Sequence, residues 1–392
     1  MTDNRPTQDT GLRGVTIAST RVSDVDGTAG RLIYRGYLIQ DLAENATFEE
    51  VCHLLLYEKL PQEHELKDFK ARLTAERDIP PELIAALKTR PRDALPMDIL
   101  QSGVAMLAHH DPDIQDTSRD ALFQKALKLI AKLPTILAAW DRIRNGNEPL
   151  ASNPRLDHAA NFLYMFNGTV PDEELARFFD ICLILHAEHS FNASTFAARE
   201  VASTRAHMYA AVAAAVGSLS GELHGGANAR VMEMLMEIGS LENVEAYVNQ
   251  TFDSGKKLMG LGHAVYTTDD PRAHILAPIS QRLGQRTGQT KWYEISKLLE
   301  IKGKEAFKRR KGRDIYVNVD FYSASLYYSM GIPFDLFTGL FAISRIAGWT
   351  AHVIEEQFAD AAPKPMLYRP ESEYIGDYCG PEVCKFVPLD ER

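Results

Sequence analysis

The sequence predicts an all-α protein with two domains. Apolar residues recur mostly at the spacing of one helical face, and runs of alternating β-branched residues are few. Apolar residues make up 45% and charged residues 24% of the 392 residues, which is typical of a globular protein. At roughly 100–200 residues per domain, a chain of this length is expected to form two domains.

The helical segments can be followed in order along the chain. Thr47 is expected to cap a helix over 47–56, and Glu50, three residues later, completes a capping box. Strand-like patterns are confined to 15–22, 31–34 and 315–319, so the fold is expected to contain only a few short strands. Further helical patterns cover 63–76, 81–88, 98–108, 118–144, 157–166, 172–189, 194–219, 227–238, 243–256, 273–285, 290–310, 322–330 and 334–358.

Three irregular segments indicate where the two domains meet. Residues 221–226, 259–272 and 311–321 have patterns that suit neither helix nor strand. A second domain of about a hundred residues, entered near 225 and left near 328, would place all three at its edges. The tail after Glu356 is rich in Pro and aromatic residues and is predicted to be an arm docked on another surface.

Charge and composition exclude several classes of protein. The chain has 43 Lys and Arg against 53 Asp and Glu, a net charge of −10, which argues against a nucleic-acid partner. Four Cys suit a reduced compartment better than a disulfide scaffold. The first residues lack the apolar core of a secretion signal, and no segment reaches the roughly 18 apolar residues of a membrane span. We expect a cytoplasmic protein without a membrane partner.

His186 and His189 form the first cluster of candidate site residues. They lie three residues apart and are expected on one face of the helix over 172–189. Histidines at a helix end commonly bond free carbonyls. A zinc site would need further ligands, and no Cys or acidic residue stands at a recognisable spacing. The prediction is that the chain has no metal site.

His224 lies in a glycine-rich segment before the helix over 227–238. Asn228 is expected to cap that helix, so that His224 lies just before its positive end. The helix dipole disfavours imidazolium, and His224 should therefore be neutral near pH 7 and able to donate one hydrogen bond. Gly225 and Gly226 would let the backbone approach a ligand closely. A turn with an incidental histidine is an equal alternative.

The segment 259–272 contains Gly260, Gly262, His263 and Arg272. The two glycines superficially resemble a dinucleotide-binding loop, but no strand precedes them and the third glycine is missing. One interpretation is a backbone loop around an acyl carrier, with His263 and Arg272 facing one pocket. The other is a surface loop.

Asp320 precedes a helical pattern, where an aspartate is by default an N-cap. The basic run 302–313 just before it is the densest in an acidic protein. This run is a solvated helix face, a nuclear signal or a site for a polyphosphate such as coenzyme A. Arg345, within an apolar stretch, and Arg369, in the tail, are charges that need an anionic partner, either a ligand or a structural carboxylate.

Together these segments resemble the citrate synthase family. His224 in LHGGAN, His263 in GHAVY with DPR following, and Asp320 in NVD resemble the three catalytic residues of the family. HAEHSFNASTF, the segments 11–15, 26–27, 34–37 and 48–51, and the tail motif YRPESEYIG are similar to its shorter bacterial branch. The resemblance covers nearly the whole chain. Glu222 stands where the family commonly has Pro.

The resemblance implies an all-helical homodimer in which each subunit has a large and a small domain. The large domain would be 1–225 plus 329–392, with the dimer contacts and the oxaloacetate site. The small domain would be 226–328 and would bind coenzyme A and close over the substrate. The implied reaction is that of an acyltransferase of the tricarboxylic acid cycle, which condenses acetyl-CoA with oxaloacetate and hydrolyses the thioester. The coenzyme A thioester is a co-substrate, and no tightly bound cofactor or metal is implied.

The resemblance also implies roles for individual residues. Asp320 would be the base, His224 would stabilise the enol(ate) and His263 would polarise the ketone of oxaloacetate. Arg369 would reach the active site of the other subunit. The dicarboxylate contacts would be His189, Arg272, Arg345, Arg369 and, as a further basic contact, Arg72. The coenzyme A contacts would be Lys257, Leu258, Met259, Gly260 and Leu261, with Lys308, Lys311 and Arg313 near its phosphates.

Three alternatives stay open at this stage. A 2-methylcitrate synthase of the methylcitrate cycle would use propionyl-CoA, and some members of the branch accept both thioesters. One methylene group is worth only about 1–3 kcal/mol of discrimination. A non-catalytic protein that binds coenzyme A or a dicarboxylate would keep the arginines but would not need Asp320. A histidine-based metallohydrolase is the third. We favour citrate synthase.

Overall fold

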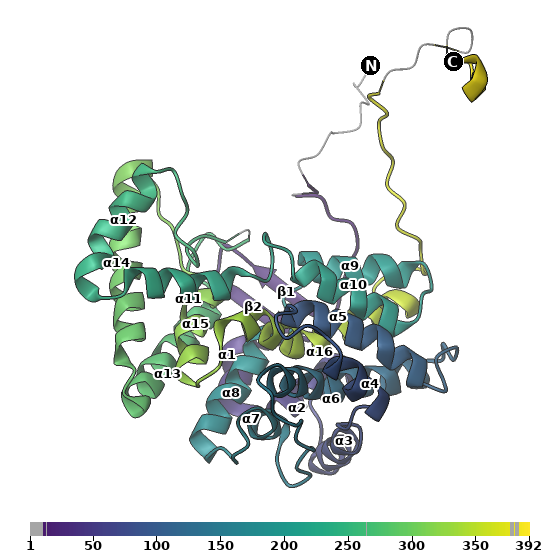
Figure 1. Ribbon diagram of the computed structural model, residues 1–392, viewed down its shortest axis with the longest axis horizontal. Helices are drawn as coiled ribbons and strands as arrows, with labels where there is room; N and C mark the ends of the chain where they lie inside the picture. Colours follow the sequence, from purple (N-terminus) through teal and green to yellow (C-terminus); the bar gives the residue numbers. More distant parts are fainter. Residues whose placement is uncertain (1–10, 13, 264, 377–379, 381–383) are drawn as a thin grey trace.

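The computed structural model describes residues 11–12, 14–263, 265–376, 380 and 384–392. Sixteen α-helices and one small sheet make up the regular structure of this part of the chain. Figure 1 shows the helices gathered into two groups, with a larger group around α16 and a smaller one that contains α12, α13 and α14. The prediction of an all-α fold with a few short strands is confirmed.

The sheet lies at the start of the described chain and has three antiparallel strands. They are β1 (Ser23–Asp26), β2 (Arg31–Tyr34) and β3 (Tyr37–Leu38), in the order β1-β2-β3. Ser23 pairs with Tyr34, and Asp26 pairs with Arg31. Two strand predictions are wrong: 15–22 pairs with no strand of the described residues, and in 315–319 only Val317 pairs, forming an isolated bridge to Leu261.

The larger group of helices confirms most of the predicted segments. The capping box is present, because Thr47 N–H donates to Glu50 Oε2 at 2.7 Å and Glu50 N–H donates to Thr47 Oγ1 at 3.4 Å. The short helix α1 was not predicted. The helices are α1 (Ile39–Asn45), α2 (Phe48–Tyr57), α3 (Glu63–Ala75), α4 (Pro81–Lys88), α5 (Pro96–Leu107), α6 (Arg119–Arg144), α7 (His158–Asn167), α8 (Glu173–His186), α9 (Ala193–Ser203) and α10 (Met208–Leu219), with a 3₁₀ turn at Ala108–His110.

The predicted helix over 194–219 is wrong as a single element. It is broken between α9 and α10, where Arg205 adopts a left-handed φ of 67°. His207 then caps α10 by accepting the Ala210 N–H at 3.1 Å. A non-glycine residue with positive φ leaves no mark in the hydrophobic pattern, so the apolar spacing continues across the break.

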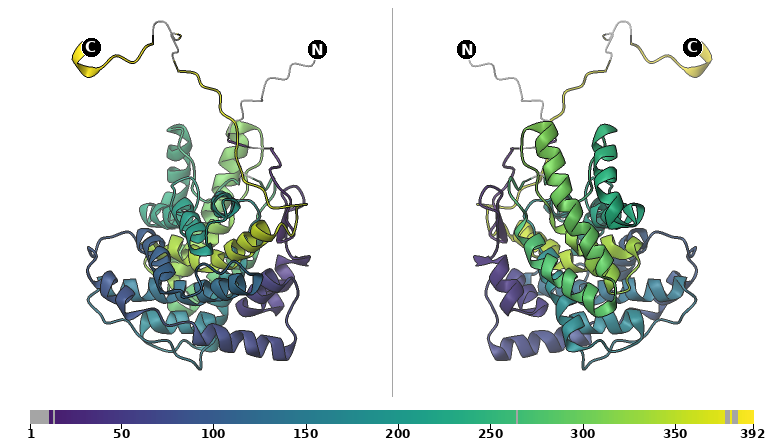
Figure 2. Two further views of the ribbon diagram at one scale, coloured as in Figure 1. Left: turned by 90° about the vertical axis from the view of Figure 1, so that its right-hand side faces the viewer. Right: turned by 90° about the vertical axis from the view of Figure 1, so that its left-hand side faces the viewer.

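The smaller group of helices follows the His224 segment. Figure 2 shows α12 and α14 projecting from the body of the molecule as a pair of neighbouring helices. The helix α15 packs on both α11 and α13. The group consists of α11 (Ala227–Ile238), α12 (Val244–Asp253), α13 (Pro271–Thr287), α14 (Thr290–Lys311) and α15 (Val319–Ser329), with a 3₁₀ turn at Leu241–Asn243.

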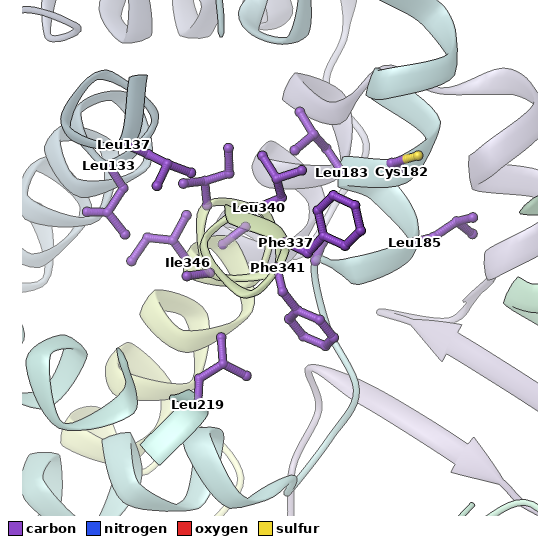
Figure 3. Close-up of a cluster of buried hydrophobic side chains, with 14 of the residues drawn as sticks. Leu133, Leu137, Cys182, Leu183, Leu185, Leu219, Phe337, Leu340, Phe341 and Ile346 are labelled. Atoms are coloured by element: carbon purple, nitrogen blue, oxygen red, sulfur yellow. The ribbon is translucent and has the colours of Figure 1, made fainter. Parts of the chain in front are cut away.

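The helix α16 (Phe337–Phe358) runs through the centre of the larger group and is buried from Phe337 to Gln357. It follows a 3₁₀ turn at Phe334–Leu336. In Figure 3, Leu133 and Leu137 of α6, Leu183 of α8 and Leu219 of α10 surround its side chains. Because α16 is covered on every side, it forms the core of the molecule and holds Arg345 within that core.

The tail after α16 contacts the body at its start and ends in a 3₁₀ turn at Leu389–Glu391. Tyr368 donates its hydroxyl to Glu356 Oε2 at 2.8 Å, and residues 369–376 are exposed. The predicted docking of the tail on another surface stays a prediction. Cys52 and Cys182 are buried free thiols, whereas Cys384 is disulfide-bonded, which departs from the expectation of reduced cysteines. In the described residues, no helix is long and apolar enough to cross a membrane.

Candidate active site

One cavity of about 510 Å³ brings together six of the predicted site residues. Five of them come from the starts of helices and from the irregular segments at the junction of the two helix groups, and the sixth comes from the middle of α16. Val25 of the sheet and Phe341 of α16 complete part of the wall. The six are His189, His224, His263, Arg272, Asp320 and Arg345.

Asp320 presents a buried carboxyl group that lacks a full set of partners. The default prediction that it caps α15 is wrong, because Asn318 is the cap and its side chain accepts the Asp320 N–H at 3.1 Å. Asp320 Oδ1 has no hydrogen-bond partner in the described part of the chain. Burial raises the pKa of Asp320 to about 7, against an opposing effect of Arg272. A carboxyl group with such a pKa can accept a proton near neutral pH.

His224 is neutral, and its proton is placed on Nδ1. Its Nε2 accepts the backbone N–H of Ser194 at 3.1 Å and lies 2.8 Å from Ser194 Oγ. Burial, with a smaller effect of Arg345, lowers the pKa of His224 to about 4. The lowered pKa agrees with the neutral state expected from the sequence, but the cap is Gly226 rather than Asn228, and the contacted helix start belongs to α9. An imidazole of this tautomer donates from Nδ1.

His263 has the opposite tautomer. Its Nδ1 accepts the backbone N–H groups of Val265 at 2.9 Å and Tyr266 at 3.0 Å. Burial, with an additional effect of Arg272, lowers the pKa of His263 to about 4. The proton of the neutral ring is therefore on Nε2, which is the atom left free to donate.

The segments that carry His263 and Asp320 are bonded to one another. Asn318 N–H donates to Gly260 O at 3.0 Å, and Asn318 Nδ2 donates to Gly262 O at 3.2 Å. Gly260 has a φ of 76°, and a Cβ there would lie 2.7 Å from a ring carbon of Phe321. Only glycine suits both conditions, so the irregular segments are close-packed rather than loose surface loops.

His189 lies beyond the end of a helix, contrary to the prediction. The helix α8 ends at His186, so His186 and His189 do not share a helical face. His186 is buried, with Nδ1 2.8 Å from Cys182 O. His189 Nε2 lies 3.3 Å from Tyr266 Oη at the cavity, and burial together with Arg272 keeps its pKa well below the usual value.

Two buried arginines supply positive charge to the cavity. Arg272 binds Asp270 through Nε at 2.9 Å and Nη2 at 2.6 Å; burial alone would lower its pKa, but Asp270 raises it. Arg345 Nε donates to His186 O at 2.7 Å, whereas its Nη2 is buried without a partner in the described residues. Burial lowers the pKa of Arg345 to about 10, so the side chain is cationic at pH 7. A buried guanidinium edge of this kind suits a carboxylate ligand.

Sequence reasoning missed several residues that hold these groups in place. Ser194 orients His224, Tyr266 contacts His189, and Asp270 pairs with Arg272. Asp270 could have been suspected because it stands two residues before Arg272. Ser194 had no comparable signal, since it lies 30 residues from the histidine that it contacts.

Other predicted residues lie outside the cavity. Arg72 is on α3, 3.6 Å from Asp68 Oδ2, and lines a separate cavity of about 320 Å³ with His53 and Tyr57. The structure therefore does not bring Arg72 to the site within one chain. Arg369 is exposed in the tail.

The predicted coenzyme A contacts are partly used in packing. A Cβ on Gly303 of α14 would lie 3.0 Å from Leu261 Cδ2 and 3.1 Å from Leu258 Cδ1, so both leucines are buried against that helix. Lys257, Met259 and Gly260 belong to the same segment. In the basic run, Lys308 pairs with Asp314 at 3.0 Å, and Lys311 and Arg313 are exposed. In the described ranges, no group of three or more His, Cys, Asp or Glu side chains could hold a metal ion.

Comparison with known proteins gives a consistent assignment. The family model described as "Citrate synthase, C-terminal domain" matches residues 11–371. A citrate synthase from Synechocystis sp. is 45% identical over 396 residues, covering 100% of this chain and 96% of the relative. A 2-methylcitrate synthase from Mycobacterium tuberculosis is 38% identical over 374 residues, covering 95% of this chain and 92% of the relative.

A solved structure agrees with this assignment. The citrate synthase from Thermoplasma acidophilum, in a ternary complex with carboxymethyl coenzyme A and oxaloacetate, superposes with a TM-score of 0.89 at 34% identity. The match covers 97% of this chain and 98% of that one. The chain therefore belongs to the citrate synthase family of acyltransferases.

Proposed function

We propose that this chain condenses acetyl-CoA with oxaloacetate and hydrolyses the resulting citryl-CoA to citrate and coenzyme A. The observation that carries the proposal is the meeting of four groups in one cavity. These are a carboxyl group with a pKa near 7, two neutral imidazoles with opposite tautomers, and a guanidinium edge without a partner. Each group has a task in this reaction.

The first step is removal of a proton from the carbon next to the thioester. Asp320 accepts that proton, and the electron pair of the C–H bond moves into the enolate. His224 donates a hydrogen bond from Nδ1–H to the enolate oxygen, which develops negative charge in this step. The burial that raises the pKa of Asp320 makes this carboxylate a stronger base than one in water.

The second step forms the carbon–carbon bond. The enolate carbon attacks the ketone carbon of oxaloacetate, and the ketone oxygen takes a proton from Nε2 of His263. Loss of the proton that Asp320 accepted in the first step and return of one to His263 restore both residues. Water then attacks the thioester carbonyl, and coenzyme A leaves as a thiol. The Nη2 of Arg345, together with Arg272 and His189, would hold the carboxylates of oxaloacetate.

The partners and the domain movement belong to the same proposal. Residues 226–328 would close over the substrates and exclude water, so that the enol meets the ketone before hydrolysis occurs. The segment 257–261 and the basic residues Lys308, Lys311 and Arg313 would contact coenzyme A through backbone and exposed charges. We propose a cytoplasmic homodimer in which Arg369 reaches the active site of the second subunit.

The acyl donor is the point on which a second candidate function rests. A relative at 38% identity carries the name 2-methylcitrate synthase, whose reaction would use propionyl-CoA. The two donors differ by one methylene group, worth about 1–3 kcal/mol of discrimination in an apolar pocket. Citrate synthase is favoured, because the relatives at 43–45% identity carry that name.

The deciding experiment is thiol release from acetyl-CoA and from propionyl-CoA, each with and without oxaloacetate. We expect release to require oxaloacetate and kcat/KM to be higher for acetyl-CoA. A higher value for propionyl-CoA would reverse the choice of donor. Thiol release that does not depend on oxaloacetate, or that a chelator abolishes, would contradict the condensation itself. Binding of the thioester or of oxaloacetate without turnover would indicate a non-catalytic protein.

A further inference from the structure

The β1–β2 hairpin touches segments on both sides of the candidate active site. Its residue Val25 lines the cavity, although the hairpin itself carries none of the proposed catalytic groups. One end of the hairpin contacts the segment around His189, and the other contacts the segment that follows His263. These two segments are more than seventy residues apart in the sequence.

The base of the hairpin is bonded to both neighbours of His189. Ser23 Oγ donates to Glu188 Oε1 at 2.9 Å and accepts the Ser190 N–H at 2.9 Å. From the other strand, the Tyr34 hydroxyl donates to Glu188 O at 2.8 Å. Ser23 and Tyr34 are themselves a register pair, so the base holds the His189 segment from two strands at once.

The turn of the hairpin is packed so closely against the His263 segment that there is no space for a Cβ atom on either of its glycines. Gly27 O accepts the Thr267 N–H at 2.9 Å, and a Cβ on Gly27 would lie 2.2 Å from Val265 O. A Cβ on Gly30 would lie 2.7 Å from Thr268 Cγ2. The turn itself is rigid, because Asp26 Oδ1 accepts the N–H groups of both Thr28 and Ala29.

The residue under this turn is one of the two that orient His263. The Val265 N–H donates to His263 Nδ1 at 2.9 Å, while the carbonyl of the same residue faces Gly27. A shift of this segment away from the hairpin would therefore move the donor that sets the tautomer and the direction of the ring. Misplacement of a reacting group by about 1 Å can cost about 100-fold in rate.

We propose that the β1–β2 hairpin is a positioning element for the condensation, which holds the His263 segment at a set distance from the His189 segment once residues 226–328 have closed over the substrates. Ser23, Gly27 and Gly30 are its positioning residues. The inference rests on the proposed function of His263 as the group that polarises the ketone of oxaloacetate. It adds to that function the part of the chain that keeps His263 aimed at the ketone.

The first test is Gly27→Ala in the full-length enzyme. Gly27 is not among the residues with positive φ, so alanine adds no backbone strain and acts only through the contact with Val265. We expect kcat to fall about 10- to 100-fold, with the KM for acetyl-CoA little changed, because the thioester is handled by other residues. The ¹³C-edited infrared band of the ketone of bound oxaloacetate should move back toward its frequency in free solution.

The matched control is Ala29→Ser, which adds one atom on the exposed side of the same turn. It should leave kcat and the ketone band as they are in the unmodified enzyme. A folded Gly27→Ala variant with the unmodified kcat and ketone band would overturn the proposal. An equal fall of kcat in Ala29→Ser would also overturn the proposal, because any change in the turn would then lower kcat whether or not it touched Val265.

A second pair of variants, at Gly30, tests the proposal if Gly27→Ala does not fold. Gly30→Ala should impair kcat, and Gly30→Ala combined with Thr268→Ser should recover part of it, because serine lacks the methyl group that the new Cβ would meet. The left-handed φ of Gly30 is strained in both variants, so their difference reports the contact alone. No recovery would contradict the proposal. An unshifted ketone band in the unmodified enzyme would instead refute the role of His263.

Discussion

At the scale of single residues, the most informative groups are those that lack partners. Asp320 Oδ1 and Arg345 Nη2 are both buried at one cavity without a hydrogen-bond partner in the described chain. A buried polar atom without a partner typically costs about 1–3 kcal/mol. Such costs are tolerated where the group is used for function. Here Asp320 Oδ1 is suited to accept a proton, and Arg345 Nη2 is suited to bind a carboxylate.

The first prediction concerns Asp320→Asn. We expect kcat to fall by about 1,000-fold or more, because the amide cannot accept the proton of the thioester. The free enzyme should also become more stable at pH 8. The raised pKa of Asp320 means that the folded state keeps a proton between about pH 4 and pH 7 that the unfolded chain has lost. The stability of the unmodified enzyme therefore falls as pH rises through this window, and the asparagine removes that cost.

The measurements are turnover under saturating substrates and urea denaturation at pH 5 and pH 8. A suitable control is Asp314→Asn, an exposed carboxylate on the same segment, which pairs with Lys308 and should change neither quantity. Turnover close to normal in a folded Asp320→Asn variant would contradict the assignment of the base.

The second prediction is the pH dependence of catalysis. Asp320 must be ionised to act, and its pKa of about 7 should produce a single acid limb in kcat/KM near that pH. His224 and His263, each with a pKa of about 4, stay neutral over the same range and should add no limb above pH 5. Initial rates between pH 5.5 and 9 will check this, and two limbs in that range would show that a histidine titrates as well.

The third prediction concerns Arg345→Leu. The change removes the guanidinium but keeps an apolar side chain in the core, so we expect the KM for oxaloacetate to rise about 10- to 100-fold. The KM for acetyl-CoA should change little. Arg345→Lys should be intermediate, because it keeps the charge and loses the fork geometry. Steady-state kinetics on both variants check this. A change in the KM for acetyl-CoA alone would contradict the prediction.

At the scale of the elements, the sequence predicted most helices, and most of their ends to within one or two residues. Periodicity reports which face of a helix is buried, and this held from α2 to α16. Ends depend on local backbone conformation, and so the breaks at Arg205 and after His186 were missed. The helix α1, with seven residues, is too short for a clear period.

The site was predictable only in part, for a related reason. Motif resemblance located the six residues of the cavity, which lie on five segments of the chain. The tautomer of His224 depends on a backbone N–H group 30 residues away that tertiary packing brings to it. The tautomer of His263 depends on the backbone conformation of the residues that follow it, whose N–H groups turn back to its ring. The hairpin contact at Gly27 likewise joins parts of the chain that no sequence pattern relates.

The fourth prediction belongs to the break between α9 and α10. Arg205→Gly should stabilise the fold by about 0.5–1 kcal/mol, because glycine adopts the left-handed conformation without a Cβ penalty. Activity should be unchanged. Glu200→Gly, an exposed position within α9, should destabilise by a similar amount. Thermal denaturation of both variants decides, and a lower melting temperature for Arg205→Gly would show that the arginine side chain has a stabilising role.

At the scale of the whole molecule, the proposed dimer would complete each site with a residue from the second chain. Arg369 lies on an exposed tail and does not line the cavity of its own chain. If it acts in the second subunit, two defective chains should complement each other. The fifth prediction is therefore that mixed dimers of Arg369→Ala and Asp320→Asn chains regain activity.

In such a mixed dimer, the chain with Arg369→Ala keeps its own Asp320 and receives Arg369 from its neighbour. One of the two sites is then complete, and about half of the normal activity per dimer is expected. The assay compares co-expressed, doubly tagged dimers with each variant alone. If Arg369 acted within its own chain, no site would be complete and the mixture would stay as inactive as its components.

The buried helix α16 has a consequence for how this enzyme can change. Arg345 is carried by a helix that the core surrounds on every side, so its position is set by the packing that keeps the protein folded. Two of the parts proposed to handle the thioester, His224 and the segment 257–261, lie instead between helices. Evolution or an engineer could therefore exchange the acyl donor by remodelling those segments, whereas a different keto acid would demand a new hydrophobic interior.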